Sequence, residues 1–140
     1  MRSALLFEPA VEAAETRRAR FELASLLSLV LGVFFLGTGI AKVASVEFVV
    51  ATFDGWPAPL WTLVALGAVE LAAAICALIP TTRLLGAGTL TLLMTGAAAY
   101  HVARGELGLL PVPLTFLAVA VSVLRLELSL RRGLVPAPSR

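Results

Sequence analysis

The sequence predicts an all-α protein, a bundle of four transmembrane helices with both termini in the cytoplasm. Of the 140 residues, 59% are hydrophobic and 14% are charged, whereas soluble domains carry about 25% charged residues. Four long apolar runs are separated by short polar stretches, and a helix of that length crosses a hydrocarbon core of about 30 Å. Basic residues gather at the ends of the runs that a four-span topology places in the cytoplasm.

The chain divides into a cytoplasmic N-terminal segment at residues 1–20, a membrane domain at 21–132 and a C-terminal tail at 133–140. The N-terminal segment is polar and mixed in charge, and it ends in Arg17, Arg18 and Arg20. From Glu8 to Arg20 it is expected to form a helix on the membrane surface, with Pro9 near its first turn. The tail carries Pro136 and Pro138 and is expected to be mobile.

The first span is predicted at about 21–43. Gly32, Gly39 and Lys42 share one face of this helix because their spacing follows the helical period. Small residues on a face allow another helix to approach closely, which is how helices pack in lipid. Lys42 lies near the outer end of the span, where its long side chain either extends outward or turns inward toward Glu70.

The longest loop, at 45–59, is predicted to hold a short helix at the membrane surface followed by a turn. A stripe of apolar residues with helical spacing indicates the short helix, and Asp54, Gly55 and Pro57 indicate the turn. Trp56 and Trp61 are placed at the level of the lipid headgroups, where tryptophan is enriched.

The second span, at 60–79, carries one carboxylate within an otherwise uncharged run. Glu70 falls near the middle of the helix, where a charged side chain raises the free energy of insertion by about 2.5–3.5 kcal/mol. Gly67 and Ala74 lie on the same face, so Glu70 belongs to the face best suited to contact another helix. A partner for this carboxylate is therefore expected inside the bundle.

The third and fourth spans are predicted at 84–102 and 112–130. The third begins after a tight turn at 81–83, and His101 lies at its far end, at the same membrane level as Lys42. Pro111 and Pro113 suit the start of the fourth helix, and Gly133 suits its end.

The distribution of basic residues sets the predicted orientation. The outer segments of the four-span topology hold Lys42 and Arg104 alone. All the other basic residues fall on the side of the termini, which is predicted to be cytoplasmic because cytoplasmic loops carry the excess of Lys and Arg. These residues are Arg2, Arg17, Arg18, Arg20, Arg83, Arg125, Arg131, Arg132 and Arg140.

Several kinds of site are excluded by composition. Cys76 is the only cysteine and His101 the only histidine, so one chain cannot form a dithiol pair, a Cys/His zinc site or a bis-His haem site. No metal is predicted. The basic residues flank the apolar runs instead of forming a patch, which excludes nucleic acid as a partner. Redox chemistry would need an organic cofactor, a partner subunit or an oligomeric site.

Lys42, Glu70 and His101 come from three spans and are predicted to converge in the outer half of the bundle. One interpretation is structural: Lys42 and Glu70 form an interhelical pair that fixes the register of the helices. The other is a polar pocket for a quinone headgroup, with Lys42 or His101 donating to a carbonyl oxygen and Glu70 exchanging a proton. Proton-coupled transport of a small solute is a third hypothesis. The rim of the predicted pocket is formed by Trp56, Tyr100, Arg104 and Glu106.

An ordered set of motifs accompanies these residues. It comprises the run from Gly37 to Lys42, the run from Gly67 to Leu71, the run from Pro80 to Ala87, the run from Met94 to Ala97 leading to His101, and the pair Gly105-Glu106. In this order the chain resembles the DoxX-like family of small four-helix bacterial membrane proteins, over about residues 25–125.

The resemblance implies a multi-pass protein of the bacterial inner membrane, associated with respiratory or thiol/sulfur redox systems. It implies an accessory subunit of a membrane oxidoreductase, with a quinone as the candidate ligand and a partner membrane protein or a second copy of the chain beside it in the lipid bilayer. A cysteine-based redox motif is absent from this sequence. The alternative is a non-catalytic scaffold or assembly factor for a partner membrane protein.

Overall fold

Helices supply all the regular structure in the computed structural model, which describes residues 2–53 and 58–132. Side chains are described from residue 11 onward, apart from Thr52. The helices are α1 (Arg2–Val43), α2 (Glu47–Thr52), α3 (Leu60–Leu78), α4 (Arg83–Ala103), the 3-10 turn η1 (Leu107–Leu109) and α5 (Pro111–Arg132). The predicted all-α class is confirmed for this part of the chain. Trp56 and the tail at 133–140 lie outside the described residues.

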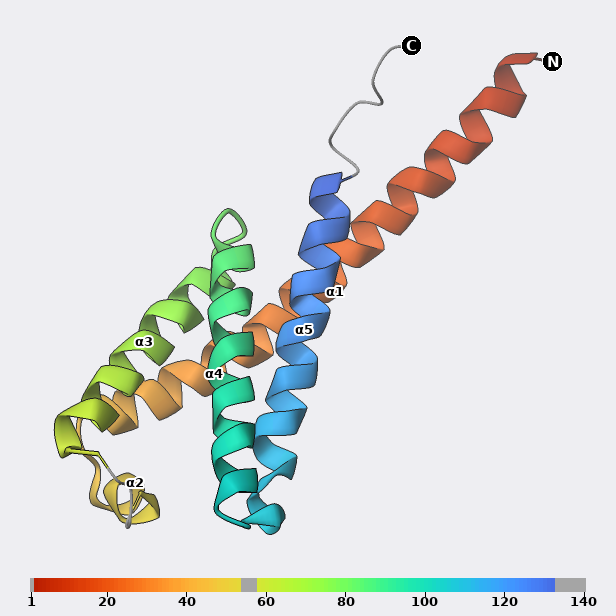
Figure 1. Ribbon diagram of the computed structural model, residues 1–140. Helices are drawn as coiled ribbons and strands as arrows, with labels where there is room; N and C mark the ends of the chain where they lie inside the picture. The colour runs from red at the N-terminus through yellow and green to blue at the C-terminus, as the bar shows by residue number, and fades with distance from the viewer. Residues whose placement is uncertain (1, 54–57, 133–140) are drawn as a thin grey trace.

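The long helices pack side by side in a closed order. α1 contacts α3 and α5, and α4 contacts the same two helices from the other side. α1 begins and α5 ends at one end of the molecule, together with the turn between α3 and α4 (Figure 1). We call this the terminal end, and the opposite end, which carries α2 and η1, the α2 end.

The helices begin and end at the proline, glycine and polar residues that flank the apolar runs of the sequence. α3, α4 and α5 begin and end within two residues of the spans predicted at 60–79, 84–102 and 112–130. The short helix predicted in the longest loop is α2. These boundaries were predictable because proline, glycine and polar residues gather at the ends of apolar runs.

The N-terminal segment differs from the separate surface helix that the sequence indicated. α1 continues from Arg2 to Val43 without a break at residue 20, and its first part projects beyond the other helices (Figure 1). No glycine or proline occurs from residue 10 to residue 31, and the Arg18–Glu22 ion pair of 2.8 Å spans the expected boundary. The sequence changes from polar to apolar near residue 20, but the helical backbone continues through this point without a break.

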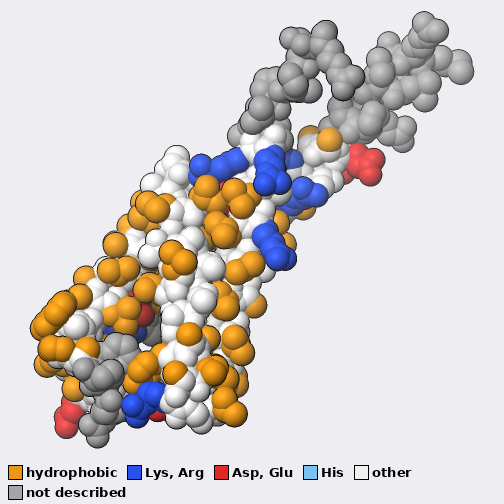
Figure 2. Space-filling model, viewed as in Figure 1, with side chains coloured by type: hydrophobic (Ala, Val, Ile, Leu, Met, Phe, Trp, Pro, Cys, Tyr) orange, Lys and Arg blue, Asp and Glu red, His pale blue; other side chains and the backbone are white. Residues whose placement is uncertain are grey.

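Three of the described helices are long and apolar enough to cross a membrane: α1 from Val11 onward, α3 and α5. α4 has a comparable length of 21 residues, but its glycines, threonines, Tyr100 and His101 make it less apolar. Large apolar side chains cover much of the outside of the helices (Figure 2). Helices of this kind indicate a membrane location.

Close contacts at glycines set how α3 lies against its neighbours. Toward the α2 end, a Cβ on Gly39 of α1 would lie 2.9 Å from the carbonyl oxygen of Gly67 in α3, and a Cβ on Gly67 would lie 2.9 Å from that of Gly39. Toward the terminal end, a Cβ on Gly86 of α4 would lie 2.5 Å from the carbonyl oxygen of Ala73. α3 approaches α4 closely near the terminal end, where its Leu78 also lies against Gly32 of α1.

The core lies where the helices cross. Leu31 and Phe35 of α1, Leu90 of α4 and Val123 of α5 are almost fully buried, with alanines of α3 packed between them. The aromatic ring of Phe35 meets that of Phe116 edge to face at 5.5 Å between centroids. The alanines allow the close helix spacing that lipid-embedded helices rely on.

Candidate functional site

Lys42 and Glu70 form a direct ion pair between α1 and α3. The Lys42 Nζ donates to Glu70 Oε2 at 2.7 Å, and the Thr38 hydroxyl donates to the same oxygen at 3.3 Å. The glycine contact explains this pair, because Gly67 lies against both Gly39 and the Cβ of Lys42. α1 and α3 run in opposite directions, and a Cβ on Gly67 would lie 2.7 Å from the Cβ of Lys42. Lys42 therefore leaves α1 beside Gly67, and its long side chain reaches Glu70 one turn further along α3.

The pair is almost enclosed by protein. The side chain of Lys42 is 11% exposed and that of Glu70 is 4% exposed. Removing one partner from such a pair costs about 3–5 kcal/mol, since it leaves an uncompensated buried charge. The interhelical pair expected from the sequence is therefore present, and it ties α1 to α3.

A cavity of about 860 Å³ lies beside this pair. Its walls come from α1, α3, α4 and α5, and Phe53 at the end of α2 and Leu109 of η1 also line it. Apolar side chains dominate the lining, and the polar side chains among them are Thr38, Lys42, Glu70, Tyr100 and His101. The molecule is visibly hollowed between α3 and α4 in this region (Figure 2).

The composition and size of the cavity are those of a small-molecule site. Ligand pockets measure about 300–1,000 Å³ and combine apolar walls with a few placed polar groups. Phe34, Phe35 and Phe116 line one wall, and the rings of Phe34 and Phe116 stack at 3.8 Å between centroids. A planar ring is the shape that such an aromatic wall accommodates.

His101 reaches the cavity but pairs away from Lys42 and Glu70. Its Nδ1 lies 2.9 Å from Glu106 Oε2, and its ring meets that of Tyr100 edge to face at 5.7 Å. Within the described part of the chain, no hydrogen bond joins His101 to the Lys42–Glu70 pair. The three predicted site residues thus share one cavity, and two of them are in contact.

The end of α4 explains why His101 meets Glu106. The N–H of Glu106 donates to the His101 carbonyl at 2.9 Å and the N–H of Gly105 donates to the Val102 carbonyl at 3.0 Å, which is the Schellman arrangement at a helix C-terminus. Gly105 has a φ of 71°, a conformation that glycine adopts without strain. The motif folds the chain back so that Glu106 lies against the last turn of α4.

Glu106 is held by two basic groups at the α2 end. Arg104 Nε donates to Glu106 Oε1 at 2.8 Å, and its guanidinium lies 5.7 Å from the centre of the Tyr100 ring. The hydrogen bond from Arg104, followed by that from His101, lowers the pKa of Glu106 below its ordinary value of 4.5. The same bond raises the pKa of Arg104, which stays charged. Of the predicted rim residues, Tyr100 lines the cavity, and Arg104 and Glu106 support it from outside the lining.

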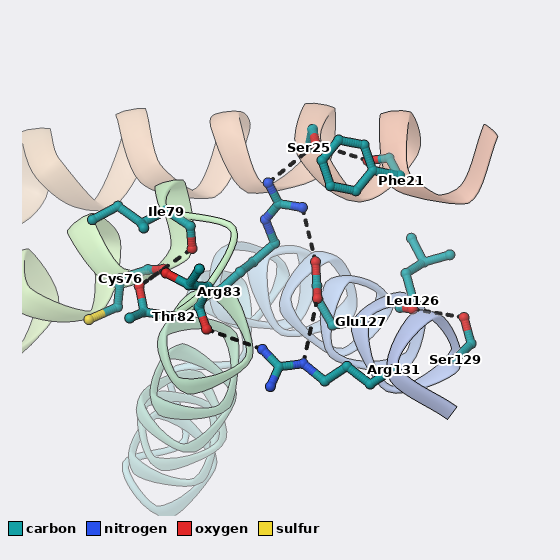
Figure 3. A network of polar contacts seen from close by, with 11 residues as sticks. Phe21, Ser25, Cys76, Ile79, Thr82, Arg83, Leu126, Glu127, Ser129 and Arg131 are labelled. Atoms are coloured by element: carbon teal, nitrogen blue, oxygen red, sulfur yellow. Dashed lines mark hydrogen bonds and ion pairs between the residues drawn. The ribbon is translucent and has the colours of Figure 1, made fainter. Parts of the chain in front are cut away.

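A second buried ion pair lies near the terminal end and joins α4 to α5. Arg83 Nη1 donates to Glu127 Oε1 at 2.9 Å, and Arg83 Nη2 donates to the Ser25 hydroxyl of α1 at 3.2 Å (Figure 3). The side chains of Arg83 and Glu127 are 3% and 8% exposed. The ring of Phe21 lies 5.5 Å from the Arg83 guanidinium.

This second pair was missed by sequence reasoning. Arg83 was expected to be a turn residue that contributes charge at the cytoplasmic surface, whereas the structure buries it as the first residue of α4. Its partner, Glu127, shares a helical face with the buried Ala120 and Val123. The signal was the single acidic residue in the fourth apolar run, placed on that face.

The residues that the structure describes contain no cluster of metal-binding side chains. Among the described residues, no three side chains of His, Cys, Asp or Glu are placed to hold a metal ion. The polar chemistry of the cavity comes from an ammonium, a carboxylate, a hydroxyl, a phenol and an imidazole.

Comparison with known proteins gives one result. A sequence model of the DoxX-like family matches residues 26–123, a stretch that includes the Lys42–Glu70 pair and the turn at the end of α4. No curated protein and no solved structure matches the chain.

Proposed function

The chain belongs to the DoxX-like family, and on that premise we propose that it is an accessory subunit of a membrane redox system that binds a quinone-like molecule in the cavity beside Lys42 and Glu70. The observation that carries the proposal is the buried ion pair at the edge of an apolar cavity of about 860 Å³. In this role the protein is a multi-pass protein of the bacterial inner membrane.

We propose α4 as the fourth membrane span. It has the length of a span, and it packs between α3 and α5, both of which are long and apolar enough to cross a membrane. Four crossings would place both termini on one side of the membrane. This agrees with the arrangement in which α1 begins and α5 ends at the same end of the molecule (Figure 1). The excess of arginine at that end favours the cytoplasm.

The polar groups of the cavity match the two needs of a quinone headgroup. A carbonyl oxygen needs a hydrogen-bond donor, and the Lys42 ammonium and the His101 imidazole both line the cavity. Reduction of the ring needs protons, and the Glu70 carboxylate, which lines the cavity, would pass one. The electrons would come from a partner oxidoreductase, and the apolar tail would leave between α3 and α4.

A scaffold or assembly factor is the second candidate. The observation that favours it is the direct 2.7 Å bond between Lys42 and Glu70, supported by Thr38, because a fully partnered pair fulfils a structural role without a ligand. A partner membrane protein would then contact the apolar outer faces of the helices, where Leu92 and Leu85 are among the most exposed side chains.

Two glycines of α4 provide a matched test. A Cβ at Gly96 or at Gly88 meets no atom within 4 Å, but only Gly96 belongs to the cavity lining. The protein is purified in a mild detergent, its bound quinone is extracted and quantified, and a short-chain quinone is titrated while the thermal unfolding midpoint is followed. We expect Gly96→Phe to remove both the retained quinone and the thermal shift, and Gly88→Phe to preserve them.

The opposite results separate the two candidates. Wild-type protein that retains no quinone and shows no thermal shift with added quinone would exclude the redox-ligand role. Co-purification of a membrane protein with the Gly96→Phe variant would then support the scaffold role.

A further inference from the structure

We propose that the terminal end carries a binding site for an anionic glycerophospholipid, with the phosphate held between Arg17 of α1 and Arg131 of α5. The site is a groove of about 720 Å³ that opens where α1 passes α5 and the turn between α3 and α4. It lies at the opposite end of the bundle from the cavity and does not depend on the proposed function. Its lining comprises Ala14, Arg17, Arg18, Phe21, Pro80, Thr81, Glu127, Leu130 and Arg131.

Positive charge exceeds negative charge in this groove. Glu127 already accepts a 2.9 Å bond from the buried Arg83, so its contact with Arg131, at 3.9 Å, is the weaker one. Arg18 is paired with Glu22, and both of these side chains are exposed. Arg17 makes no hydrogen bond or ion pair within the described part of the chain. The groove therefore presents more guanidinium groups than carboxylates, and an anion would complete it.

Arg131 is positioned by the protein instead of extending freely into solvent. Its Nη2 donates to the Thr81 carbonyl at 3.2 Å and its Nε lies 3.9 Å from Glu127 Oε2 (Figure 3). The side chain remains 46% exposed, and a guanidinium has five donors. Donors are therefore left for a phosphate oxygen, which guanidinium binds with good geometry.

The apolar part of the groove favours a lipid over a free phosphate ion. Phe21 and Leu130 line it beside the arginines, and Phe21 is partly exposed. On α1, the basic residues end at Arg20 and the apolar run begins at Leu23; in the proposed topology this boundary lies at the level of the lipid headgroups. Basic residues gather at the upper border of the apolar surface (Figure 2). Basic pockets between helices at this level bind anionic headgroups.

The test compares two double variants that remove the same charge from the same end of the molecule. Arg17→Gln with Arg131→Gln changes the groove, whereas Arg125→Gln with Arg132→Gln changes two exposed arginines that do not line it. Detergent-purified protein is titrated with phosphatidylglycerol, with phosphatidylcholine and with inorganic phosphate, and binding is followed by native mass spectrometry and by thermal shift.

We expect phosphatidylglycerol to bind more tightly than phosphatidylcholine, and the groove variant to lose about tenfold or more of this affinity. The Arg125/Arg132 variant should retain it. Because Arg131 also contacts Thr81, the single change Arg17→Glu provides a second variant that breaks no contact within the described residues. The proposal would be overturned if both double variants lost the same affinity, or if the two lipids bound equally well. It would also be overturned if Arg17→Glu kept its full affinity for phosphatidylglycerol, or if inorganic phosphate bound as tightly as the lipid.

Discussion

Gly39 of α1 and Gly67 of α3 face each other so closely that a Cβ on either would lie 2.9 Å from the carbonyl oxygen of the other. Lys42 leaves α1 beside Gly67, and its ammonium meets Glu70, one turn further along α3, at 2.7 Å. The two observations are one arrangement, because the backbone contact sets the distance across which the ion pair closes. A change at the glycines is therefore also a change at the ion pair.

Gly67→Ala is expected to destabilise the protein by about 1–3 kcal/mol, the range for overpacking a tight contact. Its Cβ would also lie 2.7 Å from the Cβ of Lys42, so the helices must separate and the ion pair must lengthen. Unfolding in mixed micelles measures the free energy. Gly37→Ala is the control, since a Cβ at Gly37 meets nothing within 4 Å. Equal stability of the two variants would show that the helices do not approach here.

The Lys42–Glu70 pair predicts a non-additive double-mutant cycle. Lys42→Met and Glu70→Gln should each cost about 3–5 kcal/mol in free energy of unfolding, because each leaves a buried partner unpaired. The double variant should cost less than the sum of the two, since no lone charge remains. The cycle is measured by unfolding in mixed micelles. Additive losses would show that the two side chains act independently.

Arg83→Gln should destabilise the protein far more than Arg131→Gln, although both arginines approach Glu127. Arg83 is buried with the carboxylate at 2.9 Å, whereas Arg131 is half exposed at 3.9 Å. Loss of the buried partner costs about 3–5 kcal/mol, and loss of an exposed one costs about 0–1 kcal/mol. Equal losses in unfolding experiments would contradict the assignment of Arg83 as the structural partner.

The contacts of Glu106 predict a dependence on acidic pH. Its pKa is lowered in the folded protein by Arg104 and His101, so its charged form is favoured by folding. This contribution to stability is complete above the ordinary pKa of 4.5 and is lost as the pH falls through the lowered pKa. A titration of the carboxyl carbon resonance of Glu106 measures the midpoint. Arg104→Gln should move the midpoint upward, and Arg125→Gln, at the other end, should leave it unchanged.

The proposed topology predicts that both termini face the cytoplasm. Fusions at Arg140 should be active with a reporter that folds in the cytoplasm and inactive with one that requires export. Fusions after Gly105, in the turn that follows α4, should behave in the opposite way. Activity of an exported reporter at Arg140 would reverse the topology.

The sequence predicted the parts of the fold that depend on local signals. The ends of α3, α4 and α5 follow proline, glycine and polar residues, and the partnership of Lys42 with Glu70 follows from two charges on small-residue faces at one depth. The continuity of α1 was not predicted, because a change in polarity resembles a boundary although the helix propensity of the residues around position 20 is unbroken.

The contacts of His101 and Arg83 depend on geometry that spacing does not reveal. His101 pairs with Glu106 because the Schellman turn at Gly105 folds the chain back. The side chain of His101 therefore bonds to a residue five positions later in the chain and not to Lys42 or Glu70. Arg83 meets Glu127 across 44 positions because α4 and α5 lie side by side. Which residues of two antiparallel helices face each other depends on the loop between them, and its course was not readable from the sequence.

The two buried ion pairs fasten different halves of the molecule. Lys42–Glu70 clamps α1 to α3, and Arg83–Glu127 clamps α4 to α5. Near the terminal end the halves are joined by the bond from Arg83 to Ser25 and by the close approach of Gly86 to Ala73. Toward the α2 end they meet through apolar contacts, and lipid offers apolar surfaces as favourable an environment as another helix does, so the seam between the halves is weakest there. The cavity lies along this seam. Spin labels at the α2 ends of α3 and α4 should therefore show a broader distribution of distances than labels at the α2 ends of α1 and α3, because the Lys42–Glu70 pair restrains only the second pair of helices.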